Sequence, residues 1–325
     1  MYDSLAYRIP EQAVVKKTGR FKAYKNADKG FVFSNFKQSK TYTFEPKELP
    51  FEQEFKPHFS ENEPHCISQQ TYLNYGNELI KKLKSDKLNK IVFSRIKKVV
   101  FDHGLILDLF DALCTAYPKA FVYLITSSEV GTWIGATPET LIHSKGNRGF
   151  SMALAGTREK NTQEPWNTKE YNEQQWVSDY LQETLERGGQ KEIEQNGPYE
   201  IDAGNLKHLR TDFSFELGSQ EPIEIAMRLH PTPAVAGLPK NESLEFISNV
   251  EEVNGGYSRD LYAGFLGLIG DNESQLYVNL RCAQFFENAA FLYVGGGYTK
   301  NSIAESEWNE TEHKSKTLLK IFEML

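Results

Sequence analysis

Hydrophobic and polar residues alternate with two different periods along this chain, and the period predicts which segments are helices and which are strands. From residue 70 to 88, apolar side chains recur at the three- and four-residue spacing of an amphipathic helix with a lysine-rich outer face. The same reasoning predicts helices over residues 105–117, 168–187 and 243–249, and in a segment after residue 301. Shorter runs that read as strands cover residues 90–100, 120–126, 131–135, 151–155, 199–218, 222–227, 261–267, 275–282 and 289–295.

These predicted strands outnumber the helices and follow one another in antiparallel runs. This order indicates an α+β fold rather than repeated βαβ units. We find no linker that would divide the 325 residues. The sequence therefore predicts one domain over residues 1–325, in which residues 1–69 form a short N-terminal part and residues 70–325 form the core.

Charge and cysteine content narrow the possible partners and compartments. The chain has 37 Lys and Arg against 44 Asp and Glu, a net charge of −7, which argues against nucleic acid or an anionic membrane as a partner. It has no apolar run near the roughly 20 residues of a membrane span, and its first residues lack the pattern of a signal peptide. Cys66, Cys114 and Cys282 are widely spaced, so we expect reduced thiols and a cytoplasmic location.

The segment from Arg281 to Lys316 holds the densest set of residues with chemical potential. An apolar run ends in the three glycines 295–297, a polar turn follows, and a helical segment then carries Glu307, Glu310 and Lys314 on one face. Bare glycine amides allow close approach of an anion, and paired carboxylates suit a divalent metal. The pattern indicates a site for an acidic small molecule with a metal. The alternative is a strand, a tight turn and a surface helix with ordinary charge pairs.

Several motifs in this chain resemble those of the chorismate-utilising enzymes, a family that includes anthranilate, aminodeoxychorismate, isochorismate and salicylate synthases. The C-terminal segments LRCAQ, VGGG and SEWNETEHK carry the resemblance, together with KIVFSR, GATPETL, AGT, LHPTPAVAGLPK and RDLYAGFLG further upstream. The motifs stand in the family's order and cover roughly residues 70–325. The resemblance implies the aminodeoxychorismate synthase-like fold, with a large antiparallel two-sheet β core and helices packed outside.

Lys90 and Glu139 occupy the positions that the resemblance assigns to acid–base chemistry. In isochorismate synthases the lysine before IVFSR activates water and the glutamate of the G-A-x-P-E-x-L segment protonates a departing hydroxyl. Burial makes a lysine a better base and a carboxyl a better acid near neutral pH. From the residues alone, a solvated strand end is the commoner interpretation of Lys90, and a charge at a helix N-terminus is that of Glu139.

Two glutamate pairs are the metal ligands that the resemblance implies. Glu170 and Glu173 lie one helical turn apart in a segment that resembles K-D-x-x-E-H, where Gln174 replaces the usual histidine. With Glu307 and Glu310 they would hold Mg²⁺, which prefers oxygen ligands and usually takes one or two carboxylates plus the substrate. We expect Glu173 and Glu310 to bind the metal directly and the other two to act through water.

The remaining predicted site residues bind or act on the substrate. The resemblance places His208 near the departing group and the AGT residues Gly156 and Thr157 at the ring carboxylate. Tyr262 and Arg281 would hold the second carboxylate, since a guanidinium matches a carboxylate bidentately. Gly295 and Gly297 would border the substrate, and Lys314 would lie near the metal-bound carboxylate. The segment LHPTPAVAGLPK is expected to shape the pocket.

The favoured activity is that of a Mg²⁺-dependent isochorismate synthase, which adds water at C2 of chorismate as the C4 hydroxyl leaves. A salicylate synthase, which then also eliminates pyruvate, is the nearest alternative, and a homologue that only binds a partner is the third. Ala155 disfavours aminodeoxychorismate synthase chemistry, and Lys90 indicates water rather than ammonia, so no glutamine amidotransferase is required. We expect a monomer whose product feeds menaquinone or siderophore biosynthesis.

Overall fold

The computed structural model describes residues 2–26, 28–85, 88–162, 164–203 and 206–325. The strands of this part of the chain are β1 (Asp3–Arg8), β2 (Val15–Ala23), β3 (Gly30–Ser34), β4 (Thr41–Lys47), β5 (Lys90–Val100), β6 (Phe121–Ser127), β7 (Gly131–Thr137), β8 (Thr140–Lys145), β9 (Arg148–Glu159), β10 (Lys191–Ala203), β11 (Leu206–Glu216), β12 (Gly237–Leu238), β13 (Phe265–Ile269), β14 (Glu273–Val278), β15 (Cys282–Phe286) and β16 (Ala289–Thr299). The helices are α1 (Phe51–Glu54), α2 (Gln69–Ser85), α3 (Ile106–Ala116), α4 (Thr168–Arg187), α5 (Pro222–Leu229), α6 (Lys240–Ile247) and α7 (Ala304–Phe322), with a 3₁₀ turn η1 (His103–Leu105) and a π-helix η2 (Ser248–Asn254).

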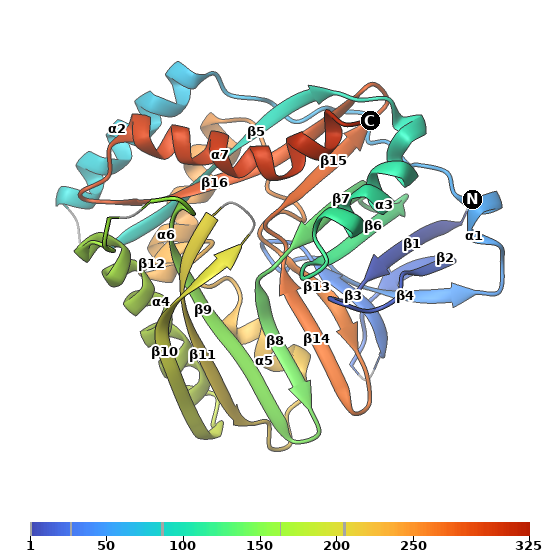
Figure 1. Ribbon diagram of the computed structural model, residues 1–325, viewed down its shortest axis with the longest axis horizontal. Coiled ribbons are helices and arrows are strands. Elements are labelled where there is room, and N and C mark those ends of the chain that lie inside the picture. Colours follow the sequence, from blue (N-terminus) through green and yellow to red (C-terminus); the bar gives the residue numbers. More distant parts are fainter. Residues whose placement is uncertain (1, 27, 86–87, 163, 204–205) are drawn as a thin grey trace.

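All strands of the described residues join one antiparallel hydrogen-bonded series, with helices packed on the outside (Figure 1). The order is β10-β11-β9-β8-β14-β13-β3-β4-β2-β1-β6-β7-β15-β16-β5-β12. The predicted α+β class with an antiparallel core is confirmed. The series has two arms, β10 to β13 and β6 to β12, and the N-terminal strands β1–β4 join them.

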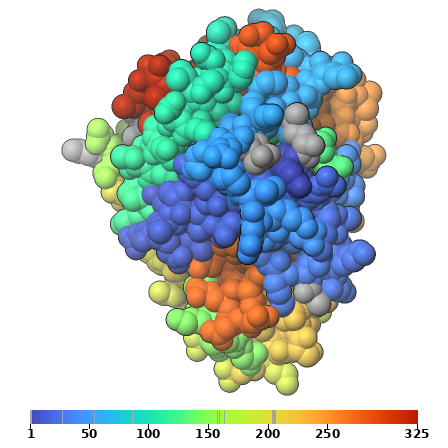
Figure 2. Space-filling model, turned by 90° about the vertical axis from the view of Figure 1, so that its right-hand side faces the viewer, coloured from blue at the N-terminus to red at the C-terminus, as the bar shows by residue number. Residues whose placement is uncertain are grey.

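The N-terminal part of the chain therefore belongs to the sheet itself. The four strands β1–β4 form the middle of the series, and this part makes up much of one side of the molecule (Figure 2). A first apolar cluster, which includes Phe31, Phe33 and Phe121, packs beneath them. A second cluster lies under α3 and α7, which cover the β6–β16 arm. The three cysteines are free.

Helix α4 shows how the sequence positions one edge of the site. Asn167 caps its start, and the Glu170 side chain accepts a hydrogen bond from the Asn167 amide to complete a capping box. Val177, Leu181 and Leu185 are buried on one face, and the helix covers β9 and β11. The predicted range, 168–187, is confirmed, as is the strand over residues 90–100.

Four predicted strands differ clearly from the structure, and in the one predicted over 261–267 residues 261–264 form a turn before β13 begins at Phe265. The segment predicted as a strand over 222–227 is the helix α5, because Pro222 stands at its first turn and Glu221 and Glu224 form a capping box. The single strand predicted over 199–218 is the pair β10 and β11, which begins earlier, at Lys191. The strand predicted over 275–282 ends at Val278, and β15 begins separately at Cys282.

The glycines 295–297 also differ from the prediction, since the strand does not end at them. They continue β16 to Thr299 and lie opposite Ser94, Phe93 and Val92 of β5. The site needs glycine here because a side chain would collide with site residues: a Cβ at position 297 would lie 2.7 Å from Cε of Lys90. A Cβ at position 295 would lie 2.8 Å from the Tyr262 hydroxyl oxygen. Only glycine leaves that room.

Candidate active site

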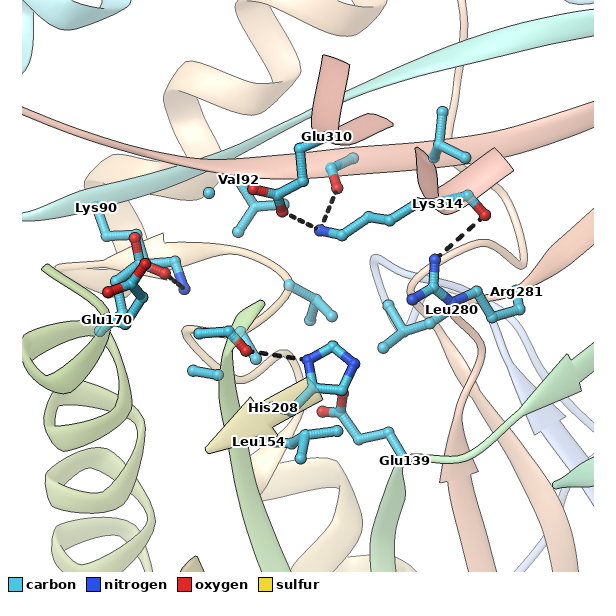
Figure 3. A pocket seen from close by; sticks show the side chains of 18 of the residues that line it. Lys90, Val92, Glu139, Leu154, Glu170, His208, Leu280, Arg281, Glu310 and Lys314 are labelled. Atoms are coloured by element: carbon cyan, nitrogen blue, oxygen red, sulfur yellow. Dashed lines mark hydrogen bonds and ion pairs between the residues drawn. The ribbon is translucent and has the colours of Figure 1, made fainter. Parts of the chain in front are cut away.

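A cavity of about 170 Å³ lies where the two arms of the sheet meet under α4 and α7 (Figure 3). We call three of its sides the helix wall, the sheet wall and the floor. The helix wall consists of Lys169, Glu170 and Glu173 of α4 and Glu310 and Lys314 of α7. The sheet wall consists of Pro138, Glu139, Leu154, Ala155, Gly156 and His208. The floor consists of Lys90 and Val92 of β5 and Val294, Gly295 and Gly297 of β16, and Ala234, Val235, Tyr262, Leu280 and Arg281 close the remaining sides.

Lys90 lies inside the molecule at the start of β5. Its side chain is 4% exposed, and its Nζ atom lies 3.8 Å from an oxygen of Glu173. The alternation of the strand places Lys90 and Val92 on the same face, toward the cavity. The alternative of a solvated lysine at a strand end is therefore wrong.

Glu139 lies between β7 and β8, and its side chain is 4% exposed. Its backbone carbonyl accepts a hydrogen bond from the Val278 amide, which ties it to β14. Burial raises the pKa of the Glu139 carboxyl to about 7, although the charges of Lys90, Arg281 and Lys314 act in the opposite direction. The alternative of a charge at a helix N-terminus is excluded, because no helix begins in the described segment between β7 and β9.

Gly156 forms a bulge in β9 beside His208. The register of β9 against β11 slips there, so that Gly156 is the extra residue, and its φ of +72° suits glycine. The Gly156 carbonyl lies 3.0 Å from Nδ1 of His208. Burial, with the charge of Arg281, lowers the pKa of His208 to about 4, so this ring is neutral at neutral pH. The side chain of Thr157, predicted to bind substrate, lies outside the described residues.

The helix wall alternates carboxylates and ammonium groups. Lys314 lies 2.7 Å from Glu310, and Lys169 lies 3.9 Å from Glu173. Burial raises the pKa of Glu173. Burial would also raise that of Glu310, but the charge and hydrogen bond of Lys314, together with the charges of Lys169 and Lys90, lower the pKa of this carboxyl instead. These two carboxylates of the wall therefore each have a cation beside them.

Glu307, the fourth predicted metal ligand, lies behind the cavity and does not line it. It accepts hydrogen bonds from Ser302 Oγ at 2.6 Å and from Lys169 Nζ at 3.0 Å. One of its oxygens faces the bare side of Gly296, where a Cβ would lie 3.3 Å away. Lys169 thus lies between Glu173 of α4 and Glu307 of α7. The only sign of this contact in the sequence is the position of the lysine next to Glu170.

The donor set of the helix wall suits a hard divalent cation. Glu173 and Glu310 present oxygens to the cavity from two helices, and Mg²⁺ usually takes one or two protein carboxylates and keeps water or substrate in its other positions. Within the described ranges, His, Cys, Asp and Glu residues do not gather in a group of three that would hold a metal by themselves. The wall therefore fits a metal ion that takes two ligands from the protein and the others from a bound substrate and water.

Positive charge gathers at the end of the cavity where Arg281 and Lys314 meet. Nη1 of Arg281 donates to the Lys314 carbonyl at 3.4 Å, and Nζ of Lys314 donates to the Gly295 carbonyl at 2.9 Å. Tyr262 is 3% exposed and packs over Gly295. This arrangement offers two cations and a hydroxyl to an anionic group.

The segment LHPTPAVAGLPK was expected to shape the pocket and does so, but the sequence did not point to the other apolar residues around the charged groups. Val92, Leu154, Leu280 and Val235 line the cavity between the named polar residues. Val235 comes from the segment LHPTPAVAGLPK, whose buried His230 lies behind the cavity with Nε2 3.0 Å from the Phe36 carbonyl. Apolar residues around a few convergent polar groups are typical of a small-molecule site.

Residues 16–323 match the model of the chorismate binding enzyme family. The chain therefore belongs to this family. Isochorismate synthase EntC of Escherichia coli is 28% identical over 252 residues, which cover 73% of this chain and 63% of that enzyme's length. The chain thus matches less than two thirds of that relative.

Two solved structures share the fold. The putative 2,3-dihydroxybenzoate-specific isochorismate synthase DhbC of Bacillus anthracis superposes with a TM-score of 0.82 at 24% identity, over 99% of this chain and 97% of that one. Anthranilate synthase component I of Streptococcus pneumoniae gives a TM-score of 0.71 at 14% identity, over 98% and 90% of the two chains. Along the described residues, no helix is long and apolar enough to cross a membrane.

Proposed function

We propose that this protein is an isochorismate synthase, which adds water at C2 of chorismate while the hydroxyl at C4 leaves. The observation that carries the proposal is the joint burial of Lys90 and Glu139 on different sides of one cavity that also holds Arg281 and Lys314. A base on one side of a ring and an acid on another are what a displacement with a poor leaving group needs. Relatives named isochorismate synthase support the same activity.

In the proposed reaction, two proton transfers accompany the exchange of hydroxyl groups. Lys90 takes a proton from the attacking water as the bond to C2 forms. Glu139, which keeps its proton up to a pH of about 7, gives it to the C4 oxygen, which leaves as water. Both ring double bonds shift as the C2–O bond forms and the C4–O bond breaks, so the product is an isomer of the substrate. Each transfer is worth about 10²–10⁴-fold in rate.

Arg281 and Lys314 would hold one carboxylate of chorismate, with the Tyr262 hydroxyl beside them. The bulge at Gly156 and the neutral ring of His208 would border the rest of the substrate near the departing group. Apolar side chains such as Val92 and Leu280 exclude water from the remaining surface of the ring.

Glu173 and Glu310 would hold a magnesium ion, with Glu170 bound through water. Glu307, which was expected to act in the same way, lies behind the cavity and would hold Lys169 between the two helices. When bound, the ion would neutralise the second substrate carboxylate, which otherwise faces the glutamates of the helix wall. The donor chemistry of the wall supports this part of the proposal.

The experiment is to incubate the purified protein with chorismate and Mg²⁺ and to separate the products by chromatography. Isochorismate as the sole product is expected. Salicylate with an equal amount of pyruvate would instead make it a salicylate synthase, and anthranilate formed on addition of ammonium would contradict water as the natural nucleophile. Turnover of the isolated chain would also show that it needs no amidotransferase subunit, and light scattering under the same conditions tests the expected monomer.

A further inference from the structure

The strand that carries Lys90 loses its second strand partner close to the cavity. Along one edge, β5 pairs with β16 over its whole length. Along the other edge, β12 lies opposite only Lys90 and Ile91, and the Ala236 carbonyl then accepts from the Val92 amide at 2.8 Å. The next polar groups of this edge are the Val92 carbonyl and the backbone of Ser94.

Three side chains replace the missing strand. Nη2 of Arg259 donates to the Val92 carbonyl at 2.7 Å, and Oε1 of Glu251 accepts from the Ser94 amide at 2.8 Å. The hydroxyl of Tyr257 donates to the Ser94 carbonyl. Buried backbone groups need partners, and here side chains far away in the sequence supply them.

Arg259 and Glu251 form a bidentate ion pair inside the protein. Nε and Nη2 of Arg259 lie 2.7 and 2.6 Å from the two Glu251 oxygens, and the side chains are only 2% and 1% exposed. Nη1 of Arg259 donates to the Val235 carbonyl at 2.7 Å. The Arg259 guanidinium thus joins the backbones of Val92 and Val235, whose residues both line the cavity.

Glu251 lies in η2, a π-helical turn that directly follows α6 and is wider than an α-helical turn. Such turns occur often at functional sites. Glu251 lies on neither wall of the cavity, and neither does Arg259 or Tyr257. Their hydrogen bonds to the site run through the backbone of β5 and the carbonyl of Val235.

We infer that Arg259 and Glu251 are positioning residues for Lys90. They fix the edge of β5 and the segment around Val235 relative to each other, and so set where the Lys90 amine meets the attacking water. This inference rests on the proposed function. A displacement of about 1 Å at a reacting group can lower the rate about 10²-fold without a large effect on binding.

Arg259→Lys is the first variant for the test. Lysine keeps the positive charge for Glu251 but has no planar fork, so it cannot reach Glu251, Val92 and Val235 together. We expect kcat with chorismate to fall about 10²-fold while KM stays close to that of the unaltered protein. Arg8→Lys is the matched control, because Arg8 is also buried and donates to the carbonyls of Cys114, Tyr117 and Ala120, away from the cavity.

A second variant keeps the test decisive if Arg259→Lys does not fold. In Glu251→Gln with Arg259→Met, both charges are removed together, so no uncompensated charge stays buried, and the side-chain oxygen of the introduced glutamine can still accept from the Ser94 amide. We expect a folded protein by circular dichroism with the same loss in kcat. A kcat within a factor of about three of the Arg8→Lys control, or equal changes in kcat and KM, would overturn the positioning role while the proposed function stands. If the unaltered protein makes no isochorismate in the same assay, the proposed function and this inference both fall.

Discussion

The helix wall and the sheet wall of the cavity both contain glutamates, and the pKa values of Glu310 and Glu139 shift in opposite directions, while Glu173 of the helix wall has a raised pKa like that of Glu139. On the helix wall, the ammonium group of Lys314 lies 2.7 Å from Glu310 and lowers its pKa in spite of burial. On the sheet wall, burial outweighs the charges of Lys90, Arg281 and Lys314 and raises the pKa of Glu139 to about 7. Glu310 therefore stays charged, and the carboxyl group of Glu139 stays protonated near neutral pH. Figure 3 shows Glu310 beside Lys314, with Glu139 on the other side of the cavity.

The difference shows that the local environment, rather than the residue type, decides what a glutamate contributes. A charged carboxylate with a nearby lysine suits a metal ion or a cationic partner. A buried, protonated carboxyl suits proton donation. Changing one wall at a time should therefore give different kinds of loss, which the following predictions separate.

The largest effect is expected from the helix wall. Glu310→Gln removes a charged oxygen that would hold the metal, and turnover of chorismate should fall below detection, as it should on addition of EDTA to the unaltered protein. Excess Mg²⁺ should restore the chelated protein but not the variant. Glu312→Gln is the matched control, because Glu312 lies on the same helix and pairs with Arg95 and Lys97 instead. Full activity in EDTA would contradict the metal proposal.

The sheet wall should respond to Glu139→Gln with a smaller loss. Glutamine keeps the size of the side chain but has no acidic proton, so kcat should fall about 10²–10⁴-fold. Chorismate binding, measured as KM or by calorimetry, should change little, since Arg281 and Lys314 remain. An unchanged kcat would exclude Glu139 as the general acid.

The pH dependence of kcat/KM tests the same wall in the unaltered protein. A general acid works only while protonated, and the raised pKa of Glu139 extends its protonated form up to about pH 7. Above that pH, kcat/KM should fall about tenfold per unit. The descending limb should be missing from the residual activity of Glu139→Gln. A decline that begins near pH 4.5, the ordinary pKa of a glutamate, would show that burial does not protect this proton.

The smallest effect concerns the contribution of His208, in the sheet wall, to the stability of the protein in acid. The pKa of His208 is lowered to about 4 in the folded protein, from an ordinary value of 6.5. Between these values the unfolded chain binds the extra proton, so stability should fall as the pH drops from 6.5 to 4, by roughly 3 kcal/mol in total. Urea unfolding of His208→Asn at several pH values should show a weaker decline. His230, whose pKa is lowered to about 3, keeps its own contribution in both proteins.

Residues predicted for the site lie together in the structure, whereas some of the elements around them differ from the prediction. Lys90, Glu139, Glu173 and Arg281 stand in short motifs whose residues lie together in the cavity, and α4 was predicted to its boundaries because it is long and well capped. Helix α5 was mistaken for a strand, since Ile223 and Ile225 alternate over a segment too short to reveal its period.

Contacts between residues that are far apart in the chain could not be predicted from the sequence alone. The contact of Lys169 with Glu307 joins residues 138 positions apart, and that of Arg259 with Val92 joins residues 167 apart. Neither lysine nor arginine shows by its type which partner it will meet. Likewise, the glycines 295–297 predicted a backbone without side chains, but only the fold shows that Lys90 and Tyr262 occupy the space beside them.

The order of the strands has a consequence for how the chain acquires its cavity. The floor uses β5 and β16 and the sheet wall uses β9 and β11, which stand near opposite ends of the series, while β1–β4 in its middle contribute no lining residue. Pairings that are distant along the chain form slowly, because the entropy of closing long loops is lost before the contacts form. We expect catalytic competence to appear late in refolding, after most of the secondary structure. In stopped-flow experiments, the recovery of turnover should then lag behind the far-ultraviolet signal.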